Sequence, residues 1–305
     1  MKKSCFIINS RISDLSNWER KIKDYCLTRN IPFEIKFTNG PGDAILITEE
    51  AINNGSEIVI AMGGDGTFNE VLNGLLSSNK ADTILFCGIP CGTANDFCKS
   101  IKMPKTIDDF FDSLSKGQIR KIDVGKVEFN MHSGESTERY FLNVSNVGFA
   151  AEVVEKVNNS KKFLGPTLTY LKAITGTILS SKTEEAIIKT DTEQWNGTLF
   201  NISICNGKFV GSGLQISPNA SVSDSFFNIT LLGKFTLLDY IKYLPKVFRG
   251  ENIKHDALTY MVCKKISVEG LVKQLGVEMD GEFVGFTKAS FVVVPEKLNI
   301  VFAGI

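Results

Sequence analysis

The sequence has few of the residues that build metal sites and disulfide frameworks. Among its 305 residues are only two histidines, His132 and His255, and its seven cysteines include no CxxC pair. An odd number of scattered cysteines is typical of reduced thiols in a cytoplasmic protein, because disulfide frameworks use pairs. We therefore expect neither a zinc site nor disulfide bonds.

The sequence also lacks an excess of charge and a long apolar run. Lysine and arginine together number 34, and so do aspartate and glutamate, so no bulk attraction to nucleic acid or to an anionic membrane is expected. No stretch approaches the ~20 apolar residues of a membrane span. The start MKKSCFIIN lacks a cleavage site and is interpreted as a first strand. These features favour a cytoplasmic protein, at most peripheral to the inner face of the membrane.

Apolar runs alternate with helical stretches in the first part of the chain. This alternation predicts βαβ units with parallel strands, hence an α/β domain with a doubly wound parallel sheet. The predicted strands are CFIIN at 5–9, FEIKF at 33–37, EIVIAM at 57–62 and TILFCGI at 83–89, with helices at 18–30 and 43–53 between them.

After Asp123 the sequence changes to short runs rich in Phe, Val, Ile and Thr, which predict an antiparallel β-rich domain. Helices are expected at 168–179 and 237–249, and FVVVP and LNIVFAGI are expected as two closing strands. The second helix has apolar residues at helical spacing and basic residues at its flanks. It could be a core helix with a solvated basic side or an interfacial helix on a membrane.

The strongest motif follows the strand EIVIAM. In GGDGTFNEVLNG, residues 63–74, three glycines around Asp65 allow the backbone to approach a phosphate closely. We expect Thr67 to cap the following helix and Glu70 to complete a capping box, leaving backbone amides free for a ligand. Because GxxxxGK[ST] is absent, this is not a P-loop.

A second loop, PCGTANDF, follows the next strand and repeats the pattern. Gly92, Thr93 and Asp96 correspond to the glycine, capping threonine and acid of the first loop. Loops at the carboxyl ends of neighbouring parallel strands converge on one crevice. Glycine turns and caps are also ordinary parts of βα units, but two matched loops favour a phosphate site. A carboxylate such as Asp65 beside a triphosphate suits a role in holding Mg²⁺ or taking a proton.

These motifs resemble the diacylglycerol kinase catalytic family, which includes bacterial lipid kinases, sphingosine kinases and ceramide kinases. The resemblance extends through IDVGKV with Asp123, FLNVSNVGF, LGPTLTY, NGKFVGSGLQISPNA with Asp224, and MDGE with Asp280 and Glu282. It implies a phosphofructokinase-like α/β domain at 1–124, a β-rich lipid-binding lid at 125–295, and a last strand, about 296–305, that returns to the first domain.

The resemblance further implies ATP and Mg²⁺ as cofactors. Asp65, Asp123, Asp280 and Glu282 would be catalytic, and Asp224 would hold a metal. The nucleotide would be bound by a set of loop residues: Asn9, Gly63, Gly64, Asp65, Gly66, Thr67, Asn69, Glu70, Gly92, Thr93, Asn95 and Asp96.

The expected activity is transfer of the γ-phosphate to a lipid hydroxyl. The general base is either Asp65 or the pair Asp280 and Glu282, and Lys161 or Lys162 could neutralise the transferred phosphoryl group. The lipid could be diacylglycerol, a sphingoid base, ceramide or an isoprenoid alcohol, and a homodimer is left open. The alternatives are an NAD kinase acting on a soluble dinucleotide and a silent nucleotide- or lipid-binding module.

Overall fold

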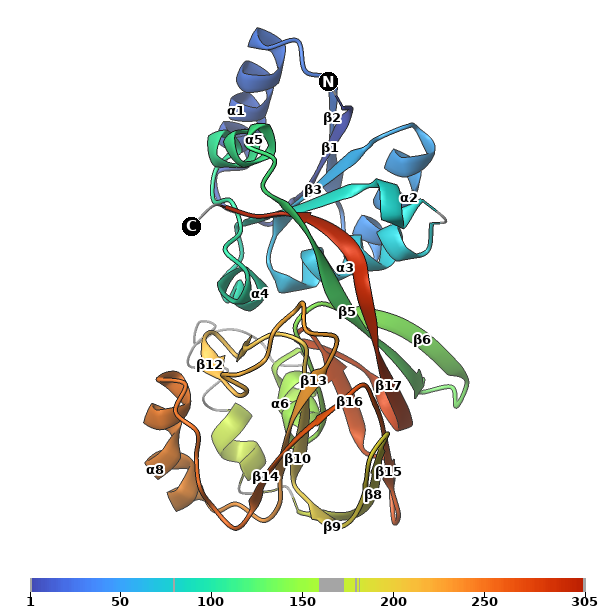
Figure 1. Cartoon of the computed structure of the whole chain (residues 1–305), viewed down its shortest axis with the longest axis vertical. Coiled ribbons are helices and arrows are strands. Elements are labelled where there is room, and N and C mark those ends of the chain that lie inside the picture. Colours follow the sequence, from blue (N-terminus) through green and yellow to red (C-terminus); the bar gives the residue numbers. More distant parts are fainter. Residues whose placement is uncertain (1, 79, 159–172, 179, 181, 304–305) are drawn as a thin grey trace. The chain divides into compact units, whose positions relative to one another are not determined.

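The computed structural model describes residues 2–78, 80–158, 173–178, 180 and 182–303 (Figure 1). These residues form two units. Unit 1 comprises Met1–Val124, Val222–Asp224 and Val294–Ile305, and unit 2 comprises Gly125–Ser221 and Ser225–Val293. Strands β5 and β17 each contribute residues to both units.

Unit 1 contains a parallel sheet with the order β17-β4-β3-β1-β2. The strand order reverses at β1, which pairs with both β2 and β3, as in doubly wound folds. The strands are β1 (Ser4–Asn9), β2 (Phe33–Thr38), β3 (Ile58–Gly63), β4 (Leu85–Pro90) and the end of β17 (Glu282–Val301). The four strands predicted from the sequence are thereby confirmed, each within about two residues.

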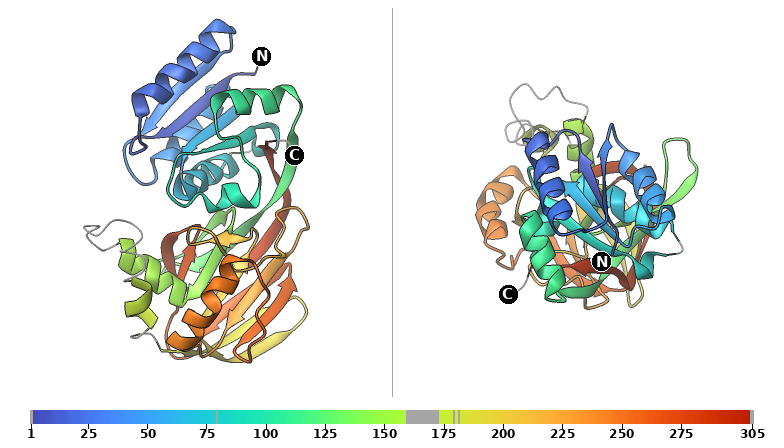
Figure 2. Two further views of the ribbon diagram at one scale, coloured as in Figure 1. Left: turned by 90° about the vertical axis from the view of Figure 1, so that its left-hand side faces the viewer. Right: turned by 90° about the horizontal axis from the view of Figure 1, so that it is seen from above.

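Helices cover both faces of this sheet (Figures 1 and 2). On one face α1 (Leu15–Thr28) packs on α5 (Ile107–Ser115), with the rings of Tyr25 and Phe111 stacked at 4.6 Å. On the other, α2 (Asp43–Asn53) packs on α3 (Asp65–Leu76). The bounds of α2 are those predicted, whereas α1 begins three residues earlier. A short 3₁₀ helix (Ala81–Thr83) and α4 (Asp96–Ser100) complete the helices of unit 1.

The last glycine of the first motif has a packing role. A Cβ atom on Gly74 would lie 2.6 Å from the carbonyl oxygen of Ile45 and 2.7 Å from Cβ of Thr48, both on α2. No side chain fits there without moving backbone. Gly74 therefore permits the close packing of α2 and α3.

Unit 2 is built from antiparallel strands, as predicted. Six of them run in the order β14-β13-β10-β7-β16-β17, and β15 joins β17 to β8 and β9. Inward-facing Phe, Val and Ile side chains form one continuous core. The bounds of these strands and of the other elements from β5 onward are β5 (Ile119–Asn130), β6 (Ser136–Phe141), β7 (Val144–Gly148), α6 (Phe149–Asn158), β8 (Glu184–Thr190), β9 (Gln194–Leu199), β10 (Asn201–Cys205), β11 (Phe209–Val210), β12 (Leu214–Gln215), β13 (Phe227–Leu232), α8 (Leu237–Phe248), β14 (Leu258–Cys263), β15 (Lys265–Gly270) and β16 (Gly276–Met279).

The expectation of two separate closing strands is wrong, because β17 is one strand of 20 residues. Pro295 and Glu296 suggested a break, and Glu296 does adopt a φ of 48°. Its N–H, however, donates a 2.8 Å hydrogen bond to the side chain of Asp123, so the strand bends and continues. Beyond the bend, Asn299 and Ile300 pair in parallel with β4.

Of the helix predicted at 168–179, residues 173–178 are helical, and 168–172 and 179 lie outside the described residues. Lys161 and Lys162, named as possible partners of the phosphoryl group, lie outside them as well. In the described part of the chain, no helix is both long and apolar enough to cross a membrane.

Candidate active site

The two glycine loops meet at the carboxyl edge of the unit 1 sheet. Gly63 at the end of β3 pairs with Pro90 at the end of β4, so the loops start side by side, as predicted. Their backbones touch: a Cβ atom on Gly92 would lie 2.4 Å from the Cα atom of Gly64. Because only glycine allows this approach, the loops form one surface of exposed backbone, as phosphate-binding loops do.

Asp65 joins the second loop to the first. Its two carboxylate oxygens accept the backbone N–H groups of Asp96 and Phe97, at 3.1 and 3.0 Å. These are the first residues of α4, so Asp65 supplies a cap from a distant part of the chain. Burial raises the pKa of the Asp65 carboxyl, while the two N–H groups oppose this shift. Asp96 itself is buried and pairs with Lys99 at 2.8 Å.

The predicted roles of Thr67, Glu70 and Thr93 as caps of these two helices are wrong. Thr67 is the third residue of α3, and its hydroxyl accepts a 3.0 Å hydrogen bond from the amide of Asn9. Glu70 instead accepts the N–H groups of Gly42 and Ala44, at the start of α2.

Helix α3 begins at Asp65 because the turn is already made at Gly64, which serves as its N-cap. In the second loop the N-cap is Asn95, at a φ of 49°, and Thr93 is exposed. The Asn95 side chain bonds both the N–H and the carbonyl of Gly92, which fixes the loop. Asn69, the remaining loop residue, is buried and accepts a hydrogen bond from Asn73.

Asp123 is 1% exposed and holds main chain rather than facing solvent. Its carboxylate accepts the N–H of Glu296, and its own N–H donates to the carbonyl of Val222 at 2.7 Å. The latter bond brings the segment Val222–Asp224 into unit 1. Among the described residues, no group of three or more Asp, Glu, His or Cys side chains around Asp224 or elsewhere could hold a metal.

In unit 2, Asp280 lies in the turn between β16 and β17, and Glu282 is the first residue of β17. The Asp280 carboxylate accepts three backbone N–H groups, those of Leu142, Asn143 and Val144, at 2.8 to 3.2 Å. Glu282 lies differently: its side chain is one third exposed (33%) and pairs with Arg139 at 3.2 Å. Of these two acids, only Glu282 presents a carboxylate that is not surrounded by backbone donors.

Sequence reasoning missed Glu278, two residues before Asp280. Glu278 is 1% exposed, and burial raises the pKa of its carboxyl from an ordinary 4.5 to about 8. Its carboxyl oxygens accept hydrogen bonds from the Asn146 amide and from the N–H of Gly281 at 3.0 Å. Glu278 stands between the apolar residues Val277 and Met279, and all three are buried. An acid between apolar residues in a strand is unusual, and this was the signal in the sequence that could have identified Glu278.

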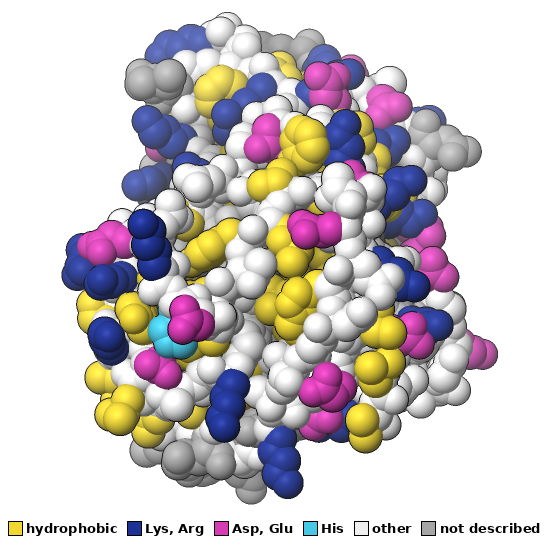
Figure 3. Space-filling model, turned by 60° about the horizontal axis from the view of Figure 1, so that its bottom comes forward, with side chains coloured by type: hydrophobic (Ala, Val, Ile, Leu, Met, Phe, Trp, Pro, Cys, Tyr) yellow, Lys and Arg dark blue, Asp and Glu magenta, His cyan; other side chains and the backbone are white. Residues whose placement is uncertain are grey.

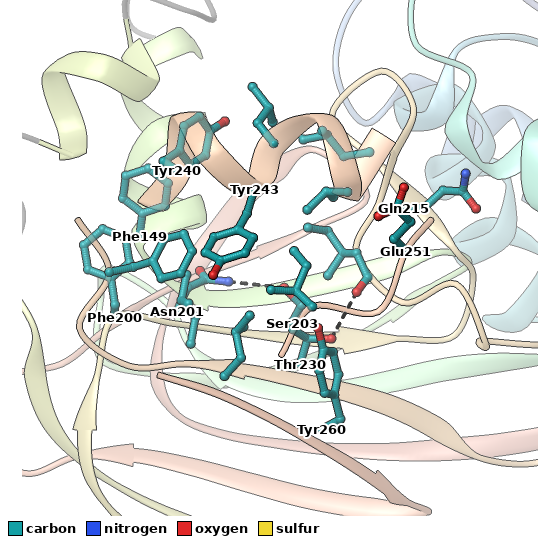
Figure 4. A pocket seen from close by; sticks show the side chains of 18 of the residues that line it. Phe149, Phe200, Asn201, Ser203, Gln215, Thr230, Tyr240, Tyr243, Glu251 and Tyr260 are labelled. Atoms are coloured by element: carbon teal, nitrogen blue, oxygen red, sulfur yellow. Dashed lines mark hydrogen bonds between the residues drawn. The ribbon is translucent and has the colours of Figure 1, made fainter. Parts of the chain in front are cut away.

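A hydrogen-bonded chain leads from Glu278 to an apolar cavity. Asn146 accepts hydrogen bonds from Ser203 and Asn201, whose side chains line the cavity wall (Figure 4). The cavity has a volume of about 130 Å³ and lies between α8 and strands β10, β13 and β14. Its remaining lining is mainly aromatic and aliphatic, including Phe149, Phe200, Leu232, Phe235, Tyr243, Leu244, Val247 and Tyr260. A mainly apolar lining with a few polar groups suits an apolar chain.

The parallel sheet with paired glycine loops and the β-rich unit define a kinase fold shared by lipid and NAD kinases. The diacylglycerol kinase catalytic domain matches residues 3–127, and the YegS C-terminal NAD kinase beta sandwich-like domain matches residues 143–302. The chain belongs to the diacylglycerol kinase family, as its motifs indicated.

Curated relatives and solved structures agree with this assignment. The chain is 30% identical to the diacylglycerol kinase of Bacillus subtilis over 268 residues, covering 87% of this chain and 84% of that protein. It is 29% identical to that of Staphylococcus carnosus, covering 86% and 82%. A diacylglycerol kinase crystal structure from Bacillus anthracis shares the fold at a TM-score of 0.73 and 19% identity, covering 99% and 97%. Yeast NADH kinase shares it less closely, at 0.57 and 10% identity, covering 99% and 84%.

Replacing Asp65 by Asn should destabilise unit 1 as well as weaken nucleotide binding. An amide has one acceptor oxygen, so one of the two N–H groups at the start of α4 would face an NH₂ group. Leaving a buried donor unpaired costs about 1–3 kcal/mol. Urea unfolding should show this loss, and hydrogen exchange at Asp96 and Phe97 should quicken.

Asp112→Asn is a matched control, since Asp112 is exposed and pairs only with Lys116 in the described contacts. It should change unfolding free energy by less than about 0.5 kcal/mol. Unchanged stability and unchanged exchange in Asp65→Asn would show that Asp65 does not hold α4.

The stability of the fold should depend on pH through Glu278. Between about pH 4.5 and pH 8 the folded protein keeps the Glu278 proton while the unfolded chain loses it. The contribution of Glu278 to the free energy of unfolding is therefore fully present below about pH 4.5. It falls as pH rises towards 8, by up to ~1.4 kcal/mol per pH unit. Glu278→Gln, which mimics the protonated form, should flatten this dependence in urea unfolding at a series of pH values.

The control is Glu138→Gln, which removes an exposed carboxylate paired with Lys126. This variant should keep the wild-type slope. The same slope in Glu278→Gln would mean that another group causes the dependence.

Proposed function

We propose that the protein is an ATP-dependent kinase that transfers the γ-phosphate to the hydroxyl of a lipid, with diacylglycerol as the first candidate. The observation that carries this proposal is the apolar cavity of unit 2, in a chain whose unit 1 has paired glycine loops. A nucleotide site alone would suit many kinases. The cavity adds a place for an acyl chain, with Asn201 and Ser203 as its buried polar groups.

The nucleotide phosphates would lie against the glycine loops at Gly64 and Gly92. These glycines carry no side chain that would keep a phosphate away, and the start of α3 favours an anion there. Mg²⁺, when bound with ATP, would neutralise phosphate charge. Asp65 is the acid at this edge, and its lone pairs beyond the two N–H bonds fit a metal or metal-bound water.

Among the proposed catalytic acids, Glu282 is the better general base. A base needs an accessible oxygen that can take a proton. Three backbone N–H groups occupy the carboxylate of Asp280, and two occupy that of Asp65. Glu282 is partly exposed, and Arg139 holds its orientation. In this scheme Asp65 and Asp280 position the loops, and Asp123 holds β17 at its bend.

An NAD kinase activity is the second candidate, because yeast NADH kinase shares the fold. A dinucleotide carries phosphates and hydroxyl groups that need polar partners along its length. The cavity lining is mostly apolar, which favours a hydrocarbon chain instead.

The direct test is incubation of the protein with labelled ATP and a panel of acceptors, followed by organic extraction. The panel is diacylglycerol, ceramide, a sphingoid base, an isoprenoid alcohol and NAD. Label in an extracted lipid supports the proposal, and the lipid that acquires it identifies the substrate. Label in NAD alone, or in no acceptor, contradicts it.

Filling the cavity should reduce activity on long-chain lipid. Leu244 lies on the cavity side of α8, and Leu244→Trp would occupy the space proposed for an acyl chain. Because the larger side chain would exclude the acyl chain, kcat/KM for lipid should fall about tenfold or more, equivalent to ~1.4 kcal/mol of lost transition-state binding. The affinity for ATP, measured by calorimetry, should stay unchanged.

Leu46→Trp is the control, because Leu46 is an exposed leucine on α2, 65% accessible. It should retain wild-type kinetics. Normal lipid kinetics in folded Leu244→Trp would place the acyl chain elsewhere.

A further inference from the structure

Helix α8 has two different faces, neither of which is buried in a core. On the inner face Tyr240, Tyr243, Leu244 and Val247 line the apolar cavity. On the outer face large apolar side chains are open to solvent: Leu238 is 78% exposed, Ile241 61% and Phe248 50%. The sequence left open a core helix or an interfacial helix. In the structure the apolar residues divide between a cavity wall and an exposed surface.

Basic side chains lie at the border between the two faces of α8. Lys242 and Lys246 are exposed, and their ammonium groups lie 4.9 and 5.7 Å from the ring of Tyr243. In Figure 3, hydrophobic and basic side chains adjoin one another on the side of the molecule where α8 lies. A helix with an exposed apolar face flanked by basic residues suits the interface of an anionic membrane.

The neighbouring acids do not cancel this basic character. Asp239 completes the capping box with Thr236 and lies 3.7 Å from His255. Glu251 pairs with Arg249 at 2.5 Å. Together Lys242, Lys246 and Arg249 outnumber Asp239 and Glu251 by one, so the helix and its C-terminal end keep a net positive charge.

We propose that the outer face of α8 docks on an anionic phospholipid bilayer. Leu238, Ile241 and Phe248 insert among the acyl chains near the head groups, and Lys242 and Lys246 contact lipid phosphates. The proposal rests on the proposed function, because the same helix roofs the cavity assigned to the lipid acceptor. Docking by α8 would bring the cavity that this helix covers next to the substrate's own medium.

A second copy of the chain fits this surface less well. A two-fold dimer through α8 would oppose the same face to itself, which brings Lys242 and Lys246 near their own copies. Anionic head groups attract these lysines, whereas a symmetric partner repels them. Charge therefore favours the membrane as the occupant.

Sedimentation with vesicles tests the proposal without any need for catalysis. Wild-type protein is mixed with vesicles of phosphatidylglycerol and phosphatidylcholine, or of phosphatidylcholine alone. It should bind the anionic vesicles more tightly, and salt should weaken this binding. Lys242→Gln with Lys246→Gln should weaken it about 25-fold, since each basic residue contributes roughly fivefold near an anionic surface.

The apolar residues are tested by Leu238→Ser with Ile241→Ser, which should reduce binding to both kinds of vesicle. The controls come from exposed positions on α1: Leu27→Ser and Lys21→Gln should bind as the wild type does. All variants should retain wild-type melting and wild-type activity on a short-chain, water-dispersed diacylglycerol, because the changed side chains lie outside the cavity.

Equal vesicle binding by α8 variants and wild type overturns the proposal, and so does equal binding of the wild type to neutral and anionic vesicles. A change from dimer to monomer in the α8 variants, with vesicle binding intact, would instead make α8 a contact between copies. If no lipid is phosphorylated by any form, the proposed function fails, and sedimentation still decides the docking surface.

Discussion

Carboxylates that accept backbone N–H groups fix the main chain around the candidate site residues in each unit. Asp65 fixes the start of α4, Asp123 holds the bend in β17, and Asp280 secures the turn between β6 and β7. In each case an acid from one segment satisfies main-chain donors of another, far away in sequence. A charged acceptor makes such bonds stronger than neutral ones. The sequence motifs suggested these acids as catalytic or ligand-binding residues, whereas the structure shows that they position main chain.

Much of this architecture follows from local sequence. The apolar runs locate the parallel strands, and the glycines at 63–64 and 92 locate two loops that touch. The capping assignments failed for a physical reason. Thr67 and Thr93 are each followed three residues later by an acid, as in a capping box. The N-cap of α3 is nevertheless Gly64, and Asp65 accepts the N–H groups at the start of α4. A helix end capped by a residue about thirty positions away has no local pattern.

The course of β17 and the position of the cavity also depend on residues that are distant in the sequence. Pro295 is a reasonable strand end by local rules, and only the side chain of Asp123 explains why the strand continues. The cavity arises where α8 rests on the sheet without filling the space above it. Its polar wall is satisfied internally, because Asn201 and Ser203 bond Asn146, which bonds Glu278. No single motif contains these residues, since they come from β7, β10 and β16.

Helix α8 explains why a periodic pattern can predict a helix and still not predict its surroundings. Its apolar residues cover more of its circumference than one contact requires, so the pattern suits burial on two sides. On one side α8 lines the apolar cavity, whereas Leu238 and Ile241 on the other side are exposed to solvent. Exposed apolar side chains of this size are unfavourable in water. A phospholipid bilayer with anionic head groups would cover these apolar side chains and attract the two lysines beside them. A protein core would do only the first.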